Sequence, residues 1–466
     1  MRKILLAVAA ALPSLALASG YTLPNTNPRD LSLSASAVAA QRDSGAAFAL
    51  PAALARLEGP YVSVGLGVVN VFNEWTDPTP GGTPARIGDP AEPGSEELDL
   101  QFTFFPNISV AYAGKLAALG DRRWGVGLGL QPFGGAIVRW PDDWAGRYRI
   151  VEVDRQVFSG ILSAGIEVLP QVRVGGGLMY YYTMQKLTQK AWMQPYPLGI
   201  GGTPTAPDAT GELDLSGGAL TYDVSVEIEP LKGLPLTIGV DYKHKATQEL
   251  DGDVEWTGVE PYLSSPAITQ DPRLTALFTA TSAEQQLTIP NLLNIGVAYR
   301  VAKPLLLTGT FTFDRWVVYD RDRFVANTGA VIEVNRNYGN GQTYRVGAEW
   351  DVGSALQLRA GIQRDISGLD ERYYSPTLPD ASSWAGSLGA TYRFGGGFSV
   401  DAAVFYANMD EVEAENAGAE PGAPDTRPGS PLPVHLFPEE NTSFRGTYEP
   451  SALVYAVAVA WKPGAK

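Results

Sequence analysis

Apolar and polar residues alternate with a period of two along most of the chain. Residues 305–314 show the pattern, in which one face carries Leu305, Leu307, Phe311 and Phe313 and the other carries Thr308, Thr310, Thr312 and Asp314. A period of two is typical of a β-strand with one apolar face. A soluble β-sandwich also alternates, but it buries its apolar face without so many aromatic residues at strand ends.

Fourteen segments with this pattern predict fourteen strands. They are 60–73, 103–114, 123–140, 148–168, 171–190, 212–228, 235–257, 284–301, 304–318, 342–352, 355–366, 383–394, 398–410 and 443–461. The links at 115–122, 169–170, 229–234, 302–303, 353–354 and 395–397 are short. Those at 74–102, 191–211, 258–283, 319–341, 367–382 and 411–442 are long and polar, and only 141–147 is brief among them. An even strand number with short turns at one end and long loops at the other is typical of an outer-membrane β-barrel.

Composition and the N-terminus support this class. Met1-Arg2-Lys3, the apolar run 4–18 and Ala16-Leu17-Ala18 predict a signal peptide over residues 1–18, since the run is short for a membrane anchor. The chain is rich in aromatic residues, with 21 tyrosines and 10 tryptophans. Interfacial girdles of a barrel are expected at Tyr180, Tyr181, Tyr182, Trp192, Trp256, Trp316, Tyr392, Phe394, Tyr406 and Trp461.

Charge and residue usage exclude several functions. A formal charge of −15 disfavours nucleic acid as a partner, and the absence of cysteine with only two histidines makes a zinc site improbable. His244 has lipid-facing parity and His435 lies in a Pro-rich loop, so a Ser-His-Asp enzyme is poorly supported. There is no nucleotide-binding GxxxxGK[ST] motif, and no cofactor or metal is expected. The long acidic loops leave a secondary adhesive role open.

The third predicted strand carries its own interruption, Pro132-Phe133-Gly134-Gly135. Proline cannot donate to the ladder, and two glycines favour a bulge or bend. A simple bulge that shapes the barrel is one interpretation. A bend that opens the wall sideways is the preferred one, since a broken ladder in lipid is costly.

The chain divides into four predicted parts: the signal peptide 1–18, an N-terminal segment 19–59, a barrel 60–461 and a short periplasmic tail 462–466. The segment 19–59 is rich in Ser and Ala and weakly periodic, so it is either a linker or a hatch that plugs the barrel. The last strand ends on Trp461, which is similar to the signal read by the barrel-assembly machinery, although five further residues follow it.

Several stretches together resemble the FadL/TodX outer-membrane transporters of long-chain fatty acids and other hydrophobic molecules. They are LTIPNLLNIGVAYR (287–300), TFTFDRW (310–316), YRVGAEW (344–350), LRAGIQRDISG (358–368), LPDASSWAGSLGATYRF (378–394) and SVDAAVFYANMDE (399–411). The family's Asn-Pro-Ala hatch motif matches Leu50, Pro51 and Ala52, with leucine in place of asparagine. The resemblance implies an all-β, 14-stranded antiparallel transmembrane barrel closed by the hatch.

The resemblance also implies a transport route. Ligand is captured among extracellular loops, held in a lumenal pocket and released laterally at a kink in the third strand, where Pro132, Phe133, Gly134 and Gly135 fall. Asp365 matches an aspartate of the family near the hatch and kink, with Gly368 in place of a following proline. The loops 191–211 and 258–283 match those of the capture groove.

The alternation of faces along each strand indicates which residues point into the lumen and could contact a ligand. Lys243, Lys245, Arg345 and Arg359 have inward parity and are candidates for binding a ligand head group, although a solvated lumenal charge network explains them as well. Arg315 has outward parity. Leu274, Leu277 and Phe278 form a helical stripe that serves either loop packing or ligand capture.

The function expected from the sequence is passive uptake of long-chain fatty acids or similar molecules. Uptake of aromatic hydrocarbons is the alternative, and a general porin is disfavoured by the predicted hatch. The expected partners are a hydrophobic small molecule, outer-membrane lipid and lipopolysaccharide, and the assembly machinery, with the protein acting as a monomer.

Overall fold

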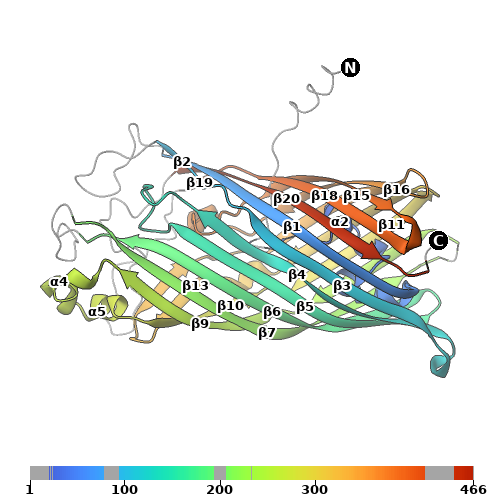
Figure 1. Ribbon diagram of the computed structural model, residues 1–466, viewed down its shortest axis with the longest axis horizontal. Coiled ribbons are helices and arrows are strands. Elements are labelled where there is room, and N and C mark those ends of the chain that lie inside the picture. The colour runs from blue at the N-terminus through green and yellow to red at the C-terminus, as the bar shows by residue number, and fades with distance from the viewer. Residues whose placement is uncertain are drawn as a thin grey trace, which may run out of the picture.

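A closed fourteen-strand antiparallel β-barrel forms the molecule, which we describe from a computed structural model (Figure 1). The structure describes residues 20, 22–23, 25–77, 94–193, 206–231, 233–414 and 446–464. The predicted signal peptide and His435 lie outside these residues. Among the described residues, no helix is long and apolar enough to cross a membrane.

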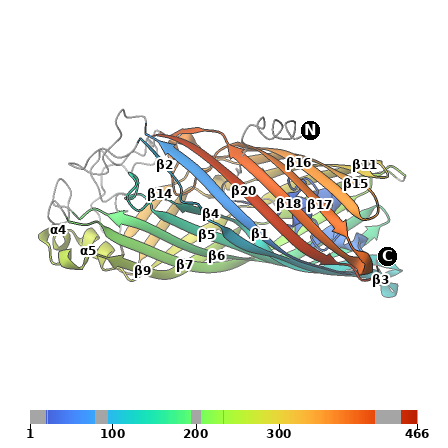
Figure 2. The same cartoon turned by 45° about the horizontal axis from the view of Figure 1, so that its top comes forward.

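The wall strands follow chain order, and each pairs with its neighbours in sequence. They are β1 (Gly59–Thr76), β3 (Thr103–Leu116), β4 (Arg122–Arg139), β5 (Glu152–Leu169), β6 (Val172–Ala191), β7 (Ala209–Ile228), β8 (Leu236–Lys243) with β9 (Ala246–Thr257), β10 (Ser282–Ile289) with β11 (Leu292–Ala302), β12 (Leu305–Asp314) with β13 (Arg321–Ala326), β14 (Val331–Asn335) with β15 (Gly341–Asp351), β16 (Leu356–Ile366), β17 (Ser383–Arg393), β18 (Phe398–Met409) with β19 (Val412–Ala414), and β20 (Gly446–Trp461). β1 pairs with both β3 and β20, for example Val62 with Trp461, so the sheet closes and leaves no edge (Figure 2).

The fourteen predicted strands are confirmed, but three of them are interrupted. The predicted strands 235–257 and 284–301 each divide into two parts. The predicted strand 304–318 ends as a strand at Asp314 and is followed by the short helix η5 (Trp316–Val318), and the predicted loop 319–341 contains the β13–β14 hairpin. The short β2 (Ser95–Glu97) pairs with the end of β1. The fourth predicted strand, 148–168, begins as β5 at Glu152, not at 148.

The strand ends that flank the long connections lie at one end of the barrel, together with η4 (Glu260–Tyr262), α4 (Pro266–Thr269) and α5 (Pro272–Phe278). Figure 1 shows α4 and α5 at this left-hand end and the C-terminus at the other. The remaining short helices are η3 (Ala117–Leu119), η5 (Trp316–Val318), η6 (Glu371–Tyr373) and η7 (Gly395–Gly397). In an outer-membrane barrel the end with long loops is extracellular.

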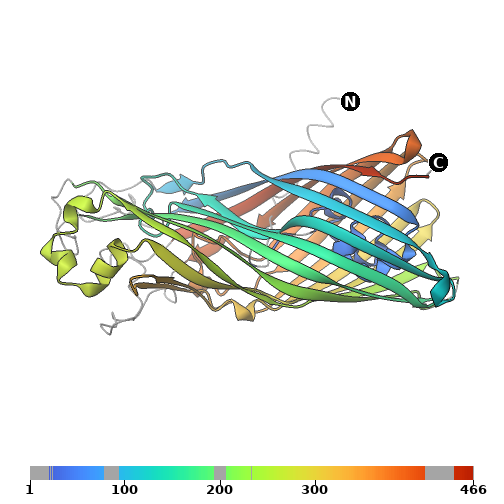
Figure 3. The same cartoon turned by 60° about the horizontal axis from the view of Figure 1, so that its bottom comes forward.

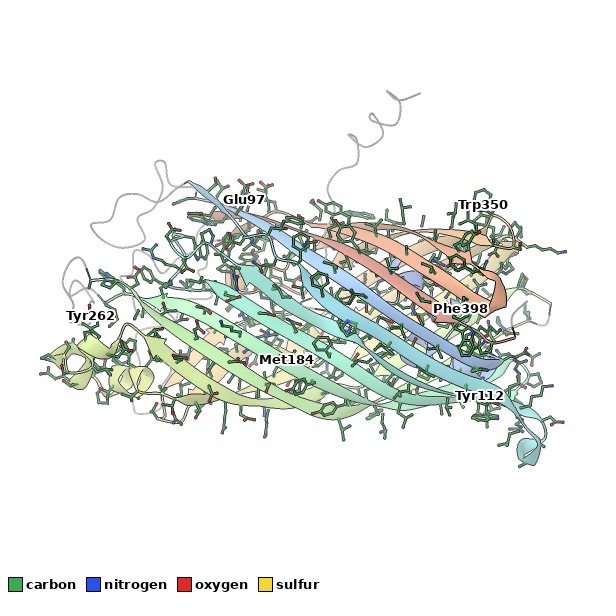
Figure 4. All side chains as sticks on the ribbon, in the orientation of Figure 1. Glu97, Tyr112, Met184, Tyr262, Trp350 and Phe398 are labelled. Atoms are coloured by element: carbon green, nitrogen blue, oxygen red, sulfur yellow. The ribbon has the colours of Figure 1, made fainter. Side chains whose placement is uncertain are left out.

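Alternation of side chains separates a lipid face from a lumen face. On β6 the side chains of Leu178 and Tyr180 are 65% and 46% exposed, whereas Met179 and Tyr181 are 1% exposed. Figure 4 shows Tyr112, Trp350 and Phe398 near the periplasmic end, and all three are exposed on the outer wall. The girdle prediction is wrong for Tyr181, Trp192 and Trp316, which are buried. An aromatic residue near a strand end occupies either face, so its position in the sequence alone did not assign it.

The N-terminal segment lies inside the barrel and fills its periplasmic half (Figure 3). It contains α2 (Pro28–Leu31), η1 (Val38–Ala40), α3 (Ala46–Ala49) and η2 (Pro51–Arg56), and nearly all of its residues between 26 and 57 are buried. Hydrogen bonds join it to several strands, including Ser34 Oγ to Ser387 Oγ (2.9 Å) and Ser44 Oγ to Ser109 Oγ (2.8 Å). We refer to residues 25–58 as the hatch.

Glycines on the inner wall allow the hatch to approach the strands closely. At ten of these glycines an added Cβ would lie within 3 Å of a hatch atom. They are Gly125, Gly127, Gly129, Gly165, Gly175, Gly239, Gly296, Gly347, Gly361 and Gly389. Ion pairs supplement this packing at the periplasmic rim, since Arg29 contacts Glu349 at 3.1 Å and Arg56 contacts Glu227 at 3.2 Å.

Candidate functional site

The interruption predicted in the third strand is a β-bulge in β4. Pro132 pairs with Phe158 and Gly134 pairs with Val157, so Phe133 is an extra residue opposite β5. Buried positions are odd-numbered from 125 to 129 and even-numbered from 134 to 140, as expected when one residue is inserted. At Gly135 a Cβ would lie 2.1 Å from the carbonyl oxygen of Arg155, so only glycine fits there.

β3 and β4 stop pairing at the same point. Their ladder runs from Leu116–Arg122 to Ile108–Leu130 and ends, although β3 continues alongside β1 to Thr103. Residues that precede the hatch lie next to the freed backbone of β4: Leu23 N donates to Phe133 O (2.9 Å), and Thr22 forms an isolated bridge with Gly134. The wall therefore loses its β3–β4 hydrogen bonds beyond Leu130.

Three neighbouring cavities, each partly open to solvent, lie between the extracellular loops and this bulge. The portal cavity, of about 830 Å³, is lined by Pro132, Gly134 and Gly135 together with residues of β1, β3 and β5. The lumenal cavity, of about 800 Å³, shares Thr22, Leu23 and Pro132 with it. The outer cavity, of about 1270 Å³ and partly open to solvent, shares Arg155 and Leu378 with the portal cavity.

Two of the four predicted head-group cations lie at the lumenal cavity. Lys243 Nζ donates to Asp223 (2.7 Å) and Asp241 (2.6 Å), so its charge is already neutralised by two carboxylates. Arg345 hydrogen-bonds to Gln363 (3.2 Å) and Thr312. Both side chains line the cavity.

The other two cations lie elsewhere. Lys245 is exposed, so its predicted lumenal orientation is wrong; β8 ends at Lys243 and the chain shifts before β9 begins at Ala246, which reverses the parity. Arg359 donates to Ser32 Oγ of the hatch (2.6 Å) and to Asp401 (3.0 Å). These bonds give Arg359 a place in the hatch–wall interface.

Asp365 and the hatch motif occupy the inner wall and its contact with the hatch. Asp365 is buried on β16 and accepts a hydrogen bond from Thr343 (3.1 Å). Leu50, Pro51 and Ala52 are buried at the corner between α3 and η2, where Ala52 N donates to Ser225 Oγ (2.9 Å). A Cβ on Gly165 would lie 2.3 Å from Pro51 O, so the motif rests directly on β5.

The helical stripe of the 258–283 loop lies on α5 and packs within the loops. Leu277 and Phe278 are buried with residues such as Val259 and Ile268, and the ring of Phe278 is 4.8 Å from that of Trp256. Leu274 packs against the same cluster. Of the three stripe residues, Leu277 also lines the outer cavity. Most of the 191–211 loop lies outside the described residues.

A buried polar cluster that the sequence did not single out lies in the outer cavity. It consists of Arg155 on β5, Asp322 on β13, Tyr319 before β13 and Arg336 after β14, and we call it the arginine cluster. Asp322 accepts from Arg155 (3.3 Å), Arg336 (2.9 Å) and the Tyr319 hydroxyl (2.7 Å). The arginines and Asp322 line the cavity wall.

The electrostatics of this cluster keep its carboxylate ionised. The flanking Arg321 and Arg323 are exposed and charged, which places β13 outside the membrane-spanning part of the wall. Burial raises the pKa of Asp322, but Arg155 and Arg336 outweigh burial and hold this pKa below its ordinary value. In the sequence, Asp322 is marked only by its position: it points inward between two arginines that point outward. Its partner Arg155 is 167 residues away in the chain.

The lining of the outer cavity is otherwise mostly apolar. It includes Val153, Leu187, Leu213, Val254, Phe324 and Ile332, and its charged side chains are Arg149, Arg155, Arg336, Glu212 and Asp322. An apolar space with a few placed polar groups is typical of a site for a small hydrophobic molecule.

A closed barrel with an internal hatch, a bulged third strand and a chain of cavities defines an outer-membrane transport barrel. The family described as "Outer membrane protein transport protein (OMPP1/FadL/TodX)" matches residues 9–462, and the chain belongs to this family. The resemblance seen in the sequence is thereby confirmed, and the protein is an outer-membrane protein of a transport family.

Solved structures and curated relatives agree with this assignment. A FadL homologue of Pseudomonas aeruginosa is 20% identical with a TM-score of 0.74, covering 95% of this chain and 99% of its own. The toluene transporter TodX of Pseudomonas putida is 12% identical with a TM-score of 0.62 and the same coverage. An outer membrane protein of Neisseria meningitidis is 26% identical over 205 residues, which is 41% of this chain and 43% of that protein. The chain thus matches less than half the length of this curated relative.

Proposed function

We propose that the protein carries long-chain fatty acids, or similar hydrophobic acids, passively across the outer membrane. The ligand enters the outer cavity among the extracellular loops, moves to the lumenal and portal cavities, and leaves sideways into the membrane at the bulge in β4. Residues 1–18 are removed as a signal peptide, and the N-terminal domain 19–59, which contains the hatch, plugs the barrel.

The arginine cluster on the apolar wall of the outer cavity carries this proposal. Guanidinium groups bind carboxylates with paired, charge-assisted hydrogen bonds. Arg155 lines both the outer and the portal cavity, so a carboxylate at this residue has the next cavity within reach. The apolar lining accepts the alkyl chain.

A lateral exit suits such a ligand on energetic grounds. A chain of about sixteen carbons gains on the order of 10 kcal/mol by avoiding water, at about 0.8 kcal/mol per CH₂. A route through cavities into the bilayer preserves that gain, whereas passage through the hatch into the periplasm loses it. The buried ion pairs and close glycine contacts of the hatch support a hatch that stays in place.

Uptake of aromatic hydrocarbons is the second candidate. The mostly apolar lining of the outer cavity favours it, and two structural neighbours carry the name toluene transporter. An uncharged hydrocarbon gives no reason for arginines in the cavity wall. A general porin is the least supported candidate, because the hatch fills the lumen.

The proposal predicts that affinity depends on the ligand's carboxylate and on Arg336. Replacing Arg336→Gln should weaken binding of a long-chain fatty acid to the purified protein about tenfold, and binding of its methyl ester should change little. Arg336→Lys should restore part of the loss, because it keeps the charge. Calorimetric titration of the folded barrel measures both ligands.

Arg321→Gln provides the matched control, because it removes an exposed cation from β13 outside the cavity. Equal affinity for acid and ester in the unmodified protein would contradict a carboxylate site. Tight binding of toluene alone would move the function to hydrocarbons.

A further inference from the structure

Three neighbouring wall strands are interrupted at the same level. β8 and β9 separate at His244–Lys245, and β11 and β10 separate at Pro290–Asn291, with Lys243–Leu292 and Ala246–Ile289 paired on either side. β12 ends at Asp314, and Arg315 N donates to Asn291 O (3.1 Å). His244–Lys245, Asn291 and Arg315 therefore form one row across adjacent strands.

The row marks a boundary on the outer surface of the barrel. On its periplasmic side the outward residues are apolar, as shown by Val224, Ile295 and Val297, which are 49%, 40% and 45% exposed. On its extracellular side the exposed residues of β9 and β10 are polar and mostly acidic, including Glu249, Asp251, Asp253, Glu255 and Glu284. An apolar belt that gives way to charge is where the hydrocarbon of the outer leaflet ends.

Two exposed cations lie in this row. Lys245 and Arg315 are both exposed, and neither has a carboxylate within 4.0 Å among the described residues. Other exposed cations toward the extracellular end are paired: Arg321 with Glu333 (2.8 Å), Arg323 with Glu333 (3.4 Å) and Arg372 with Asp370 (2.5 Å). On a surface rich in carboxylates, the absence of a partner for these two neighbours is notable.

Spacing and flanking groups suit a phosphate. Adjacent strands are about 4.8 Å apart, so the backbones on either side of Asn291 are separated by about 10 Å, which the long side chains of Lys245 and Arg315 readily bridge. His244 stacks on Tyr222 at 4.7 Å and hydrogen-bonds through Nδ1 with the Tyr242 hydroxyl (3.0 Å). Such aromatic groups are typical of a head-group interface.

We propose that Lys245 and Arg315 bind a phosphate of a phosphorylated lipid in the outer leaflet, the lipid A head group of lipopolysaccharide. Its acyl chains lie along the apolar surface formed by Val224, Ile295 and Val297. The acidic surface above repels this anionic lipid, so the cation pair provides the place where its head group meets the wall. This site lies on the lipid face and is independent of the transported ligand.

Binding of a defined lipid tests the site. The full-length folded barrel in detergent is titrated with bis-phosphorylated lipid A and with the same lipid stripped of phosphate, and complexes are counted by native mass spectrometry. The unmodified protein should prefer the phosphorylated lipid. Lys245→Gln with Arg315→Gln should lower that affinity about thirtyfold, and Lys245→Arg with Arg315→Lys should retain it.

The control removes two exposed cations from periplasmic turns, Lys303→Gln with Arg122→Gln. Unchanged binding in the Lys245/Arg315 variant, or an equal loss in the control, would overturn the proposal. Displacement of the lipid by excess inorganic phosphate would reduce the site to an anion site without lipid specificity, and would also overturn it. Heat-dependent electrophoretic mobility verifies that each variant is folded.

Discussion

At the scale of single residues, Asp322 decides the character of the outer cavity. It is 1% exposed and accepts hydrogen bonds from Arg155, Arg336, Tyr319 and Gln285. Without this carboxylate the two guanidinium groups would be buried side by side, which is costly. Asp322 therefore holds the arginines in the cavity wall where a ligand carboxylate can reach them.

The pH dependence of stability tests this role. Asp322→Asn should destabilise the barrel by about 3 kcal/mol at neutral pH, since it breaks a buried ionic cluster. Because the pKa of Asp322 is below its ordinary value in the folded protein, its contribution is complete above the unfolded pKa of about 3.9 and is lost as pH falls through the folded pKa. Urea unfolding should give the same difference between unmodified protein and variant at pH 7 and pH 5. A difference that already shrinks between those values would show that the pKa is raised.

Single residues were also the hardest to assign from the sequence. Lys243 and Lys245 share parity, yet Lys243 lines the lumen and Lys245 faces outward, because the chain shifts between β8 and β9. Arg155 is one of several polar residues on an inward face. Only the fold places it beside Asp322, so no local pattern distinguished it.

At the scale of elements, the hatch and the wall are fitted to each other by small residues. Gly361 on β16 lies against the backbone of the hatch, where a Cβ would be 2.3 Å from the carbonyl carbon of Leu33. Backbone atoms on both sides leave nothing that can move aside cheaply. The alanines and serines of residues 32–55 give the hatch the matching small surface.

A valine at Gly361 should therefore displace the hatch. Gly361→Val is expected to raise ion conductance through single barrels in planar bilayers several-fold, because the lumen is no longer filled. Gly386→Val is the control, since a Cβ at Gly386 meets nothing within 4 Å. Conductance equal to that of the unmodified protein in a folded Gly361→Val barrel would show that the hatch tolerates the extra volume.

The elements themselves were predictable where the period of two persists. β3, β6 and β16 match the predicted strands closely, because lipid on one side and hatch or cavity on the other enforce alternation along them. The interruptions at 244–245, 290–291 and 315–320 were not foreseen, although Pro290 marks one of them. The bulge at Pro132–Gly135 was foreseen, because proline and two glycines have few uses within a strand.

At the scale of the whole molecule, the cavities are arranged so that the proposed route turns sideways. The outer and portal cavities share Arg155 in their linings, the portal cavity lies at the bulge in β4, and the hatch fills the periplasmic half. Because β3 and β4 stop pairing beyond Leu130, the portal cavity is next to the point where the wall is least continuous. The proposed function depends on lateral release of the ligand at this point.

Lateral release is tested by straightening β4. Deleting Phe133 with Pro132→Thr removes the extra residue, restores the register with β5 and leaves every other side chain on its present face. Phe133→Ala is the control, because it removes the ring and keeps the bulge. Uptake of labelled oleate is measured in an outer-membrane strain that lacks its own transporter. We expect saturable uptake with the unmodified protein and with Phe133→Ala, and at least a tenfold loss with the straightened strand. Full uptake through a folded barrel with a straight β4 would contradict lateral release.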